Sequence, residues 1–125
     1  MDEPKILVID DDADLQEYCR VVLEANGYAV TAASSGAEGR QQMSAAPADL
    51  VILDVMMEEA DAGFQTARWF AAHYPGVPVL MLSNIADAAD RVFDTSTLGV
   101  ADLVNKPIEP QVLLAKVGRL LQRRT

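Results

Sequence analysis

Five side chains capable of chemistry stand at or near the ends of short apolar segments of this sequence. Asp10 and Asp11 follow "ILVI", Asp54 follows "LVIL", Ser83 follows "VPVLML", and Lys106 closely follows "ADLV". Carboxylate oxygens are ligands that suit a hard cation such as Mg²⁺. A carboxylate beside such a cation and a lysine can accept a phosphoryl group, forming an aspartyl phosphate. The residue types therefore predict Mg²⁺ binding and phosphoryl transfer, with Lys106 neutralising charge and Ser83 donating a hydrogen bond to the transferred group.

Each of these residues alone also has an ordinary structural explanation. A single aspartate after a strand usually forms a turn or caps a helix, and this is the role we expect for Asp12. A lone lysine is usually solvated, and a lone serine usually caps a helix. The set as a whole favours a functional site, because adjacent carboxylates at the end of a buried segment repel each other and lose hydration. Zinc is not expected, since Cys19 lies on an apolar helix face and His73 lies elsewhere in the chain.

The apolar segments alternate with stretches of helical spacing. We expect strands within residues 6–9, 28–32, 50–53, 77–82 and 101–104. We expect a helix after each strand; the fourth, within residues 85–99, is rich in Thr, Ser and Asp and should be short or labile. This alternation predicts an α/β fold, a doubly wound parallel sheet with helices on both faces. Ligands bind such sheets at the carboxyl ends of the strands, where the polar residues fall.

Length, charge and cysteine content limit the class of protein. A chain of 125 residues, half of them apolar, suits one domain, so we expect a single domain over residues 1–125 without an output domain. The net charge of -9 argues against direct nucleic-acid binding. No apolar run approaches the roughly 20 residues that cross a bilayer, so no membrane contact is expected. The single cysteine favours a reducing, cytoplasmic location.

Four motifs together resemble the receiver domain of two-component response regulators over the whole chain. They are "ILVIDDD", "DLVILDVMM", "PVLMLS" and "NKP", in this order. The resemblance implies a flavodoxin-like sheet of five strands in the order 2-1-3-4-5, with the strand at 28–32 at an edge. It also implies a signalling protein rather than a conventional enzyme.

The resemblance assigns a role to each site residue. Asp54 would accept a phosphoryl group from a histidine kinase or a phosphotransfer protein. Mg²⁺ would be held by Asp10, Asp11, Asp54 and the backbone carbonyl of Met56. Ser83 and Lys106 would contact the phosphoryl group, and the peptide bond between Lys106 and Pro107 would be cis. Phosphorylation would then change the binding of a downstream protein or a covalently linked output domain.

Three departures from the family pattern qualify these roles. After Asp54 the chain reads "MMEEADAG", with Glu58 in place of the usual proline and a loop that is one residue longer. Leu103 occupies a switch position that is usually Tyr or Phe, so an aromatic rotation cannot be the signal. Met56 and Ile85 are apolar at the two positions that flank the attacking water, which predicts slow hydrolysis of the phosphorylated aspartate.

One aromatic residue and two alternative functions complete the sequence-based hypotheses. Trp69 falls opposite the apolar face of the third helix, so we expect an exposed side chain that could anchor a partner or a homodimer. A receiver-like adaptor that binds without phosphorylation is one alternative function. A small haloacid-dehalogenase-type phosphatase is the other, because Asp10 and Asp12 imitate its motif, with Asp10 as nucleophile.

Overall fold

The computed structural model describes residues 3–54, 62–84 and 101–123, with only the backbone described at residues 62–64, 83, 84, 103, 105 and 123. Strands and helices alternate along the chain. The strands are β1 (Lys5–Ile9), β2 (Ala29–Ala33), β3 (Leu50–Asp54), β4 (Val79–Asn84) and β5 (Asp102–Lys106). The helices of the described ranges are α1 (Ala13–Glu24), α2 (Gly36–Ala45), α3 (Ala62–His73) and α6 (Pro110–Arg123). The helix expected within residues 85–99 lies outside the described residues.

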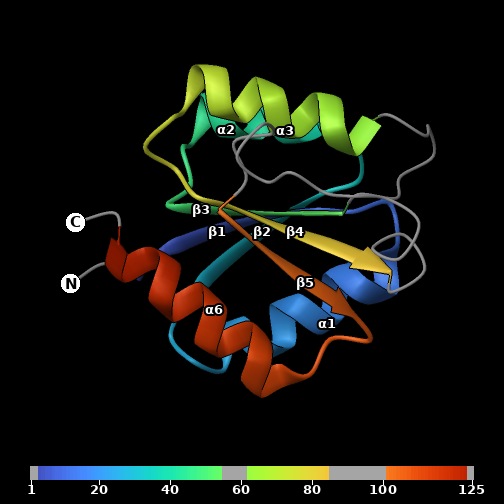
Figure 1. The fold of residues 1–125 in the computed structure, drawn as a ribbon, viewed down its shortest axis with the longest axis vertical. Helices are drawn as coiled ribbons and strands as arrows, with labels where there is room; N and C mark the ends of the chain where they lie inside the picture. Colours follow the sequence, from blue (N-terminus) through green and yellow to red (C-terminus); the bar gives the residue numbers. More distant parts are fainter. Residues whose placement is uncertain (1–2, 55–61, 85–100, 124–125) are drawn as a thin grey trace.

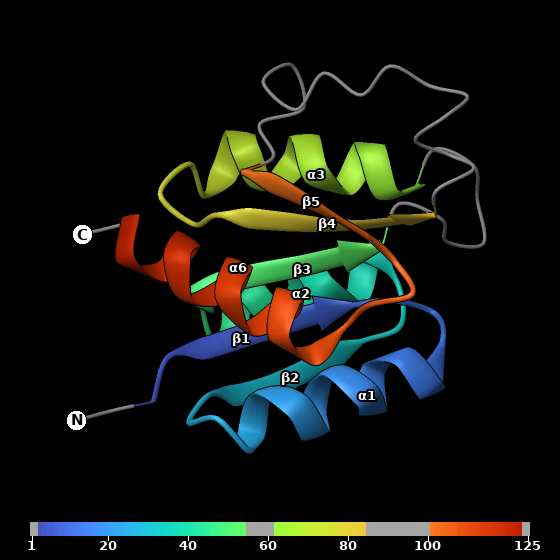
Figure 2. The ribbon, with the colours of Figure 1, turned by 60° about the horizontal axis from the view of Figure 1, so that its bottom comes forward.

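The five strands form one parallel sheet in the order β2-β1-β3-β4-β5. β2 is therefore an edge strand, as the family resemblance implied, and β3 lies at the centre with all five residues buried. α2 and α3 cover one face of the sheet, while α1 and α6 cover the other (Figures 1 and 2). The predicted doubly wound α/β architecture and strand order are confirmed.

Alternate residues of β1, β3 and β4 supply two separate cores. On β1, Leu7 and Ile9 join the core beneath α2 and α3, whereas Ile6 and Val8 join the core beneath α1 and α6. This alternation follows from the two-residue repeat of a strand, and it explains the unbroken apolar runs of a sheet covered on both faces. All four side chains are almost completely buried.

Local signals at the helix ends match the residues that the sequence places there. Asp12 is the N-cap of α1 and accepts a hydrogen bond from the backbone N–H of Asp14. Ser35 caps α2 in the same way, accepting from the N–H of Glu38. Gly27, just beyond α1, has φ of +90°, a conformation that only glycine adopts without strain. The two N-caps fix where α1 and α2 begin, and so where the loops that follow β1 and β2 end.

α2 packs unusually close to its neighbours at two glycines. A Cβ atom added to Gly39 would lie 2.4 Å from Cδ1 of Ile9, and one added to Gly36 would lie 2.2 Å from Oγ1 of Thr66. Gly39 therefore lets α2 approach β1, and Gly36 lets it approach α3. This close approach brings the β2–α2 turn near the carboxyl end of β1.

The exposure expected for Trp69 is wrong. Its side chain is half-buried against the core beneath α2 and α3, stacks on His73 with ring centroids 4.4 Å apart, and lies 5.9 Å from the guanidinium carbon of Arg40. The helical wheel assumed a single buried face, but α3 packs against α2 as well as the sheet. A role for Trp69 in partner binding stays a prediction.

No helix in the described part of the chain combines the length and the apolar character that crossing a bilayer requires.

Candidate functional site

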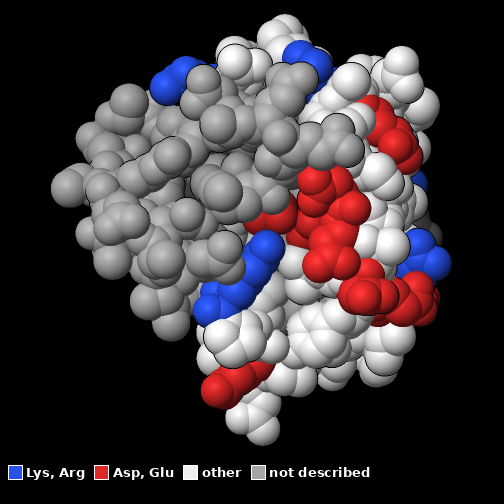
Figure 3. All heavy atoms as spheres, turned by 90° about the vertical axis from the view of Figure 1, so that its right-hand side faces the viewer, with Lys and Arg blue, Asp and Glu red and all other residues white. Residues whose placement is uncertain are grey.

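The carboxyl ends of β1 and β3 bring three carboxylates together. Ile9 pairs with Leu53 in the parallel register, so the residues that follow them, Asp10 and Asp54, are neighbours. Carboxylate oxygens of Asp10, Asp11 and Asp54 all lie within 4.8 Å of one another. Figure 3 views the molecule from the side toward which the strand arrows point and shows acidic side chains gathered there beside a basic one. The structure therefore assembles the predicted acidic site from residues more than forty positions apart in the sequence.

Asp10 is the most deeply buried member of the site. Its side chain is fully buried, and its Oδ1 accepts a hydrogen bond from the backbone N–H of Asp12 at 2.9 Å. Its Oδ2 is buried without a hydrogen-bond partner. Burial, helped by the charge of Asp54 and opposed by the Asp12 hydrogen bond, raises the pKa of Asp10 to about 7. A buried, unpartnered oxygen in an acidic group is a position that a cation would satisfy.

Lys106 supplies a positive charge to the site from β5. Its Nζ donates a hydrogen bond to Oδ1 of Asp54 at 3.2 Å. Asp54 is almost completely buried, whereas a quarter of the Lys106 side chain is exposed. The peptide bond between Lys106 and Pro107 is cis, as predicted. The ion pair leaves the ammonium group next to the carboxylate on the solvent side of the site.

Gln16, in the first turns of α1, also contacts the site, and sequence reasoning missed it. Its amide Nε2 donates to the backbone carbonyl of Asp10, and the carbonyl of Ala33 and Oγ of Ser34 lie 3.2 and 3.3 Å away. Nothing in the sequence around Gln16 distinguishes it from a solvated helical glutamine, because its partners come from turns.

The other predicted site residues lie partly or wholly outside what the structure describes. Ser83 is on β4, opposite Asn105 of β5, and Leu103 is on β5, opposite Met81. Their backbone positions place Ser83 on the strand beside β3 and Leu103 on the next strand out, and their side chains are outside the described residues. Met56, Glu58 and Ile85 lie outside them entirely. The structure thus brings together Asp10, Asp11, Asp54 and Lys106 of the predicted set.

The donor set of the acidic site fits Mg²⁺. All its ligand atoms are carboxylate oxygens, which hard cations prefer. The unpartnered Oδ2 of Asp10 offers one of them from the buried side. Cys19, which is buried nearby, does not add a thiolate ligand, because burial and the charge of Asp10 raise the pKa of its thiol to about 12. These observations favour Mg²⁺ over zinc.

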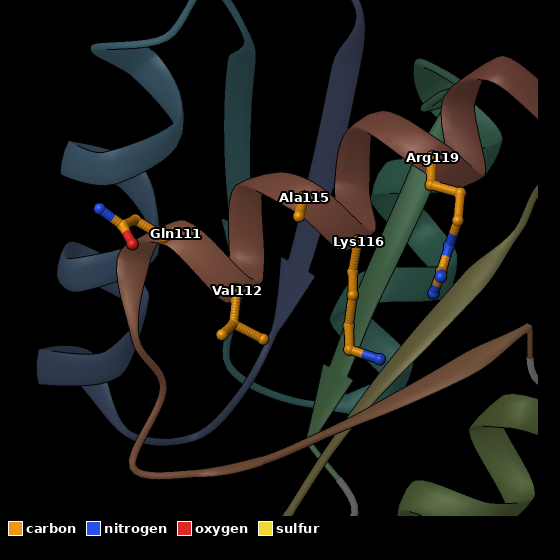
Figure 4. A pocket seen from close by; sticks show the side chains of 5 residues that line it. All are labelled: Gln111, Val112, Ala115, Lys116 and Arg119. Carbon is orange, nitrogen blue, oxygen red and sulfur yellow. The ribbon is translucent and has the colours of Figure 1, made fainter.

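A second surface feature, on α6, lies away from the acidic site. Five α6 residues line a shallow pocket: Gln111, Val112, Ala115, Lys116 and Arg119 (Figure 4). The last two pair with Asp102, the first residue of β5, at the amino end of the strand. Lys106 ends the same strand, so these two ion pairs and the acidic site lie at opposite ends of β5. None of the five residues that line the α6 pocket is a member of the acidic site.

Comparison with known protein families shows the family to which this chain belongs. The family described as the response regulator receiver domain matches residues 6–118. The chain belongs to this family. Among curated relatives, this receiver domain is 39% identical to the transcriptional regulatory protein GltR of Pseudomonas aeruginosa, over 94% of the chain and 49% of GltR. The receiver domain spans about half the length of the curated relatives it matches.

Solved structures agree with this assignment. A response regulator receiver domain protein from Clostridium thermocellum is 27% identical, with a TM-score of 0.86 over 97% of this chain and 96% of that one. The signal receiver domain of a signal transduction histidine kinase from Syntrophus aciditrophicus is 31% identical, with a TM-score of 0.84 over 95% of this chain and 90% of that one. This receiver domain therefore resembles a receiver from a response regulator and a receiver that is part of a histidine kinase.

Proposed function

We propose that this receiver domain is a phosphorylation switch in which Asp54 accepts a phosphoryl group from the phosphohistidine of a histidine kinase or a phosphotransfer protein. The observation that carries the proposal is the buried pair of Asp10 and Asp54, with an unpartnered oxygen on Asp10 and Lys106 at 3.2 Å from Asp54. Two buried carboxylates side by side cost free energy, and a divalent cation offsets that cost. The family to which the chain belongs supports the same reading.

The site residues divide the work of phosphoryl transfer. A carboxylate oxygen of Asp54 forms a bond to phosphorus while the bond from phosphorus to the donor histidine breaks, and the histidine leaves as a neutral imidazole on gaining a proton. Asp10 and Asp11, with Asp54, would hold Mg²⁺, which supplies positive charge against the phosphoryl oxygens. Lys106 neutralises part of the same charge and turns its ammonium from Asp54 to the new group. Met56 and Ser83, by family resemblance, contribute a carbonyl ligand and a hydrogen bond.

The output of the switch is a change in partner binding. Phosphorylation converts the carboxylate of Asp54 into a larger and more negative acyl phosphate, so the Lys106 hydrogen bond at the end of β5 must rearrange. The binding change would reach a downstream protein or a covalently linked output domain. Any nucleic-acid contact would belong to that output domain, because the acidic charge of this chain opposes it. In this proposal Leu103 occupies the switch position on β5, and Trp69 would anchor a partner protein or a second copy of the chain in a homodimer.

Acetyl phosphate labelling tests the proposal directly. The purified domain is incubated with Mg²⁺ and acetyl phosphate, and its intact mass is measured. We expect one phosphoryl adduct that Asp54→Asn abolishes and that Asp102→Asn, a matched change at the far end of β5, leaves in place. Labelling that survives Asp54→Asn but disappears in Asp10→Asn would indicate the phosphatase chemistry instead. A domain that takes no label under any of these conditions would favour the phosphorylation-independent adaptor.

A further inference from the structure

The side chain of Gln16 ties the turn that carries Asp10 and Asp11 to the edge of the sheet. Its Nε2 donates to the carbonyl oxygen of Asp10, while the carbonyl of Ala33 and the hydroxyl of Ser34 are within hydrogen-bonding distance of the same nitrogen. An amide nitrogen carries two N–H donors, so it serves several acceptors at once. Gln16 therefore joins the β1–α1 turn to the β2–α2 turn.

The carbonyl that Gln16 holds belongs to the peptide between the two acidic residues. The peptide unit is planar, so fixing the direction of the Asp10 carbonyl also fixes the amide of Asp11. Rotation of this plane changes ψ of Asp10 and φ of Asp11 together, and it would swing the Asp11 carboxylate relative to the Asp10 carboxylate. Their convergence to within 4.8 Å thus depends on the orientation of one peptide.

Within the part of the chain that the structure describes, other hydrogen bonds hold the two sides of this peptide but not its oxygen. The N–H of Asp10 donates to the carbonyl of Ala33 at 3.0 Å, and Oδ1 of Asp10 accepts from the N–H of Asp12. With Asp10 and Ala33 so joined, their two carbonyl oxygens both lie near the Gln16 amide, and a donor between them offsets their repulsion. A glutamine meets this need because it reaches from the helix with a neutral donor that does not compete with a cation.

The tie continues into α2. The N–H of Ser34 donates to Oε2 of Glu38, and Oε1 of the same carboxylate lies 3.3 Å from Nε2 of Gln42. Gln42 in turn donates to the carbonyl of Ala32 on β2 at 2.9 Å. Gln42 is therefore a glutamine of similar burial that holds a β2 carbonyl in the same network without touching the acidic turn, which makes it a matched control.

We infer that Gln16 is a positioning residue for the cation site, one that orients the peptide between Asp10 and Asp11 so that both carboxylates face the same ion. The inference rests on the proposed Mg²⁺ function of the acidic site. Gln16 does not ligate the ion; it acts through the backbone of the residues that do. Partners that orient metal ligands in this way typically change metal affinity by about 10- to 100-fold when they are removed.

The test compares Mg²⁺ binding by the wild-type domain, Gln16→Met and Gln42→Met. Methionine keeps the length of the side chain and removes the amide. Mg²⁺ dissociation constants are measured by calorimetric titration at about pH 8, above the pKa of Asp10, and the melting temperature of each metal-free protein is measured in parallel. We expect Gln16→Met to bind Mg²⁺ about tenfold more weakly, with Gln42→Met at the wild-type affinity and both variants losing similar thermal stability.

The outcomes separate this inference from the proposal on which it rests. If folded Gln16→Met binds Mg²⁺ with wild-type affinity, the positioning role is overturned and the cation site is not affected. The same conclusion follows if Gln16→Met and Gln42→Met lose Mg²⁺ affinity equally. A wild-type domain that binds no Mg²⁺ overturns the cation site and the positioning role together. If Gln16→Met does not fold, Gln16→Asn takes its place, since it keeps an amide one methylene short of the Asp10 carbonyl and should also weaken Mg²⁺ binding.

Discussion

Lys106 reaches Asp54 across a strand that lies between them. Asp54 ends β3 and Lys106 ends β5, and β4 separates these strands in the sheet. Neighbouring strands are about 4.8 Å apart, so the side chains must span roughly twice that distance at the sheet edge. The 3.2 Å contact between Nζ and Oδ1 shows that the lysine side chain does so. The long, flexible side chain of Lys106 can therefore contact Asp54 at the end of β3 from its own position on the edge strand β5.

Replacing Lys106 should slow phosphorylation. Lys106→Met keeps the aliphatic chain but removes the charge that faces the transferred group, so labelling by acetyl phosphate with Mg²⁺ should be about 10- to 100-fold slower. The rate is read from the time course of intact mass. Lys116→Met, whose ammonium pairs with Asp102 instead, should label at the wild-type rate. Unchanged labelling in Lys106→Met would exclude a role for this ion pair in the chemistry.

The raised pKa of Asp10 should make the metal-free domain less stable as pH rises. In the unfolded chain this carboxyl has a pKa of about 3.9, whereas burial raises it to about 7 in the folded domain. The folded state holds the proton more tightly, so the contribution of Asp10 is complete below about pH 4 and is lost as pH rises through about 7. Urea unfolding from about pH 4 to 8, in the presence of a chelator, measures this loss.

Asp10→Asn isolates this effect from other titrating groups. The amide cannot ionise, its oxygen can still accept from Asp12, and its nitrogen can donate toward Asp54. The metal-free variant should therefore be more stable than the wild type near pH 8, by about 1–3 kcal/mol. The difference between the two proteins should shrink as pH falls below 7. A difference that is constant with pH would contradict a raised pKa at Asp10.

Mg²⁺ binding should weaken in acid for the same reason. The ion requires the Asp10 carboxylate, so protons compete with it below a pKa of about 7. Between about pH 8 and 6 the dissociation constant should rise by about tenfold, and the increase in melting temperature given by a fixed Mg²⁺ concentration should shrink accordingly. Sodium chloride at the same ionic strength controls for screening. A dissociation constant independent of pH would contradict proton competition at Asp10.

The aspartyl phosphate should hydrolyse slowly. By family resemblance, Met56 and Ile85 flank the attacking water, and neither side chain can orient it by a hydrogen bond. After acetyl phosphate is removed, the adduct should persist for minutes or longer in Mg²⁺, as followed by intact mass. Met56→Asn should shorten its life by supplying a polar group there. A wild-type half-life of seconds would contradict the prediction.

The parts of the fold and site that the sequence predicts are those encoded by local chemistry. Short apolar runs marked the five strands, and the carboxylates that follow two of them marked the acidic edge of the sheet. Asp12 was readable as a cap because capping depends on a few adjacent residues. Asp10 and Asp54 could be brought together because parallel strands present their carboxyl ends at one edge.

What escaped prediction depends on contacts between distant elements. The role of Gln16 depends on the carbonyl of Asp10 after β1 and the carbonyl of Ala33 at the end of β2, which no spacing rule connects. Trp69 was expected to be exposed because a helical wheel gives one apolar face, whereas α3 also packs against α2. The spacing of apolar residues along a helix identifies the face that packs on the sheet. It does not show that a second helix packs against the side of the first.

The packing of α2 on β1 makes Gly39 sensitive to substitution. In Gly39→Ala the new Cβ would lie 2.4 Å from Cδ1 and 2.8 Å from Cγ1 of Ile9, so α2 must shift or Ile9 must leave its rotamer. Overpacking of this kind should destabilise the domain by about 1–3 kcal/mol despite the better helix propensity of alanine. Gly76→Ala, whose Cβ would meet nothing within 4 Å, is the control. Urea unfolding followed by the fluorescence of Trp69, the single tryptophan, measures both. Equal stability of Gly39→Ala and the wild type would show that the α2–β1 contact yields without cost.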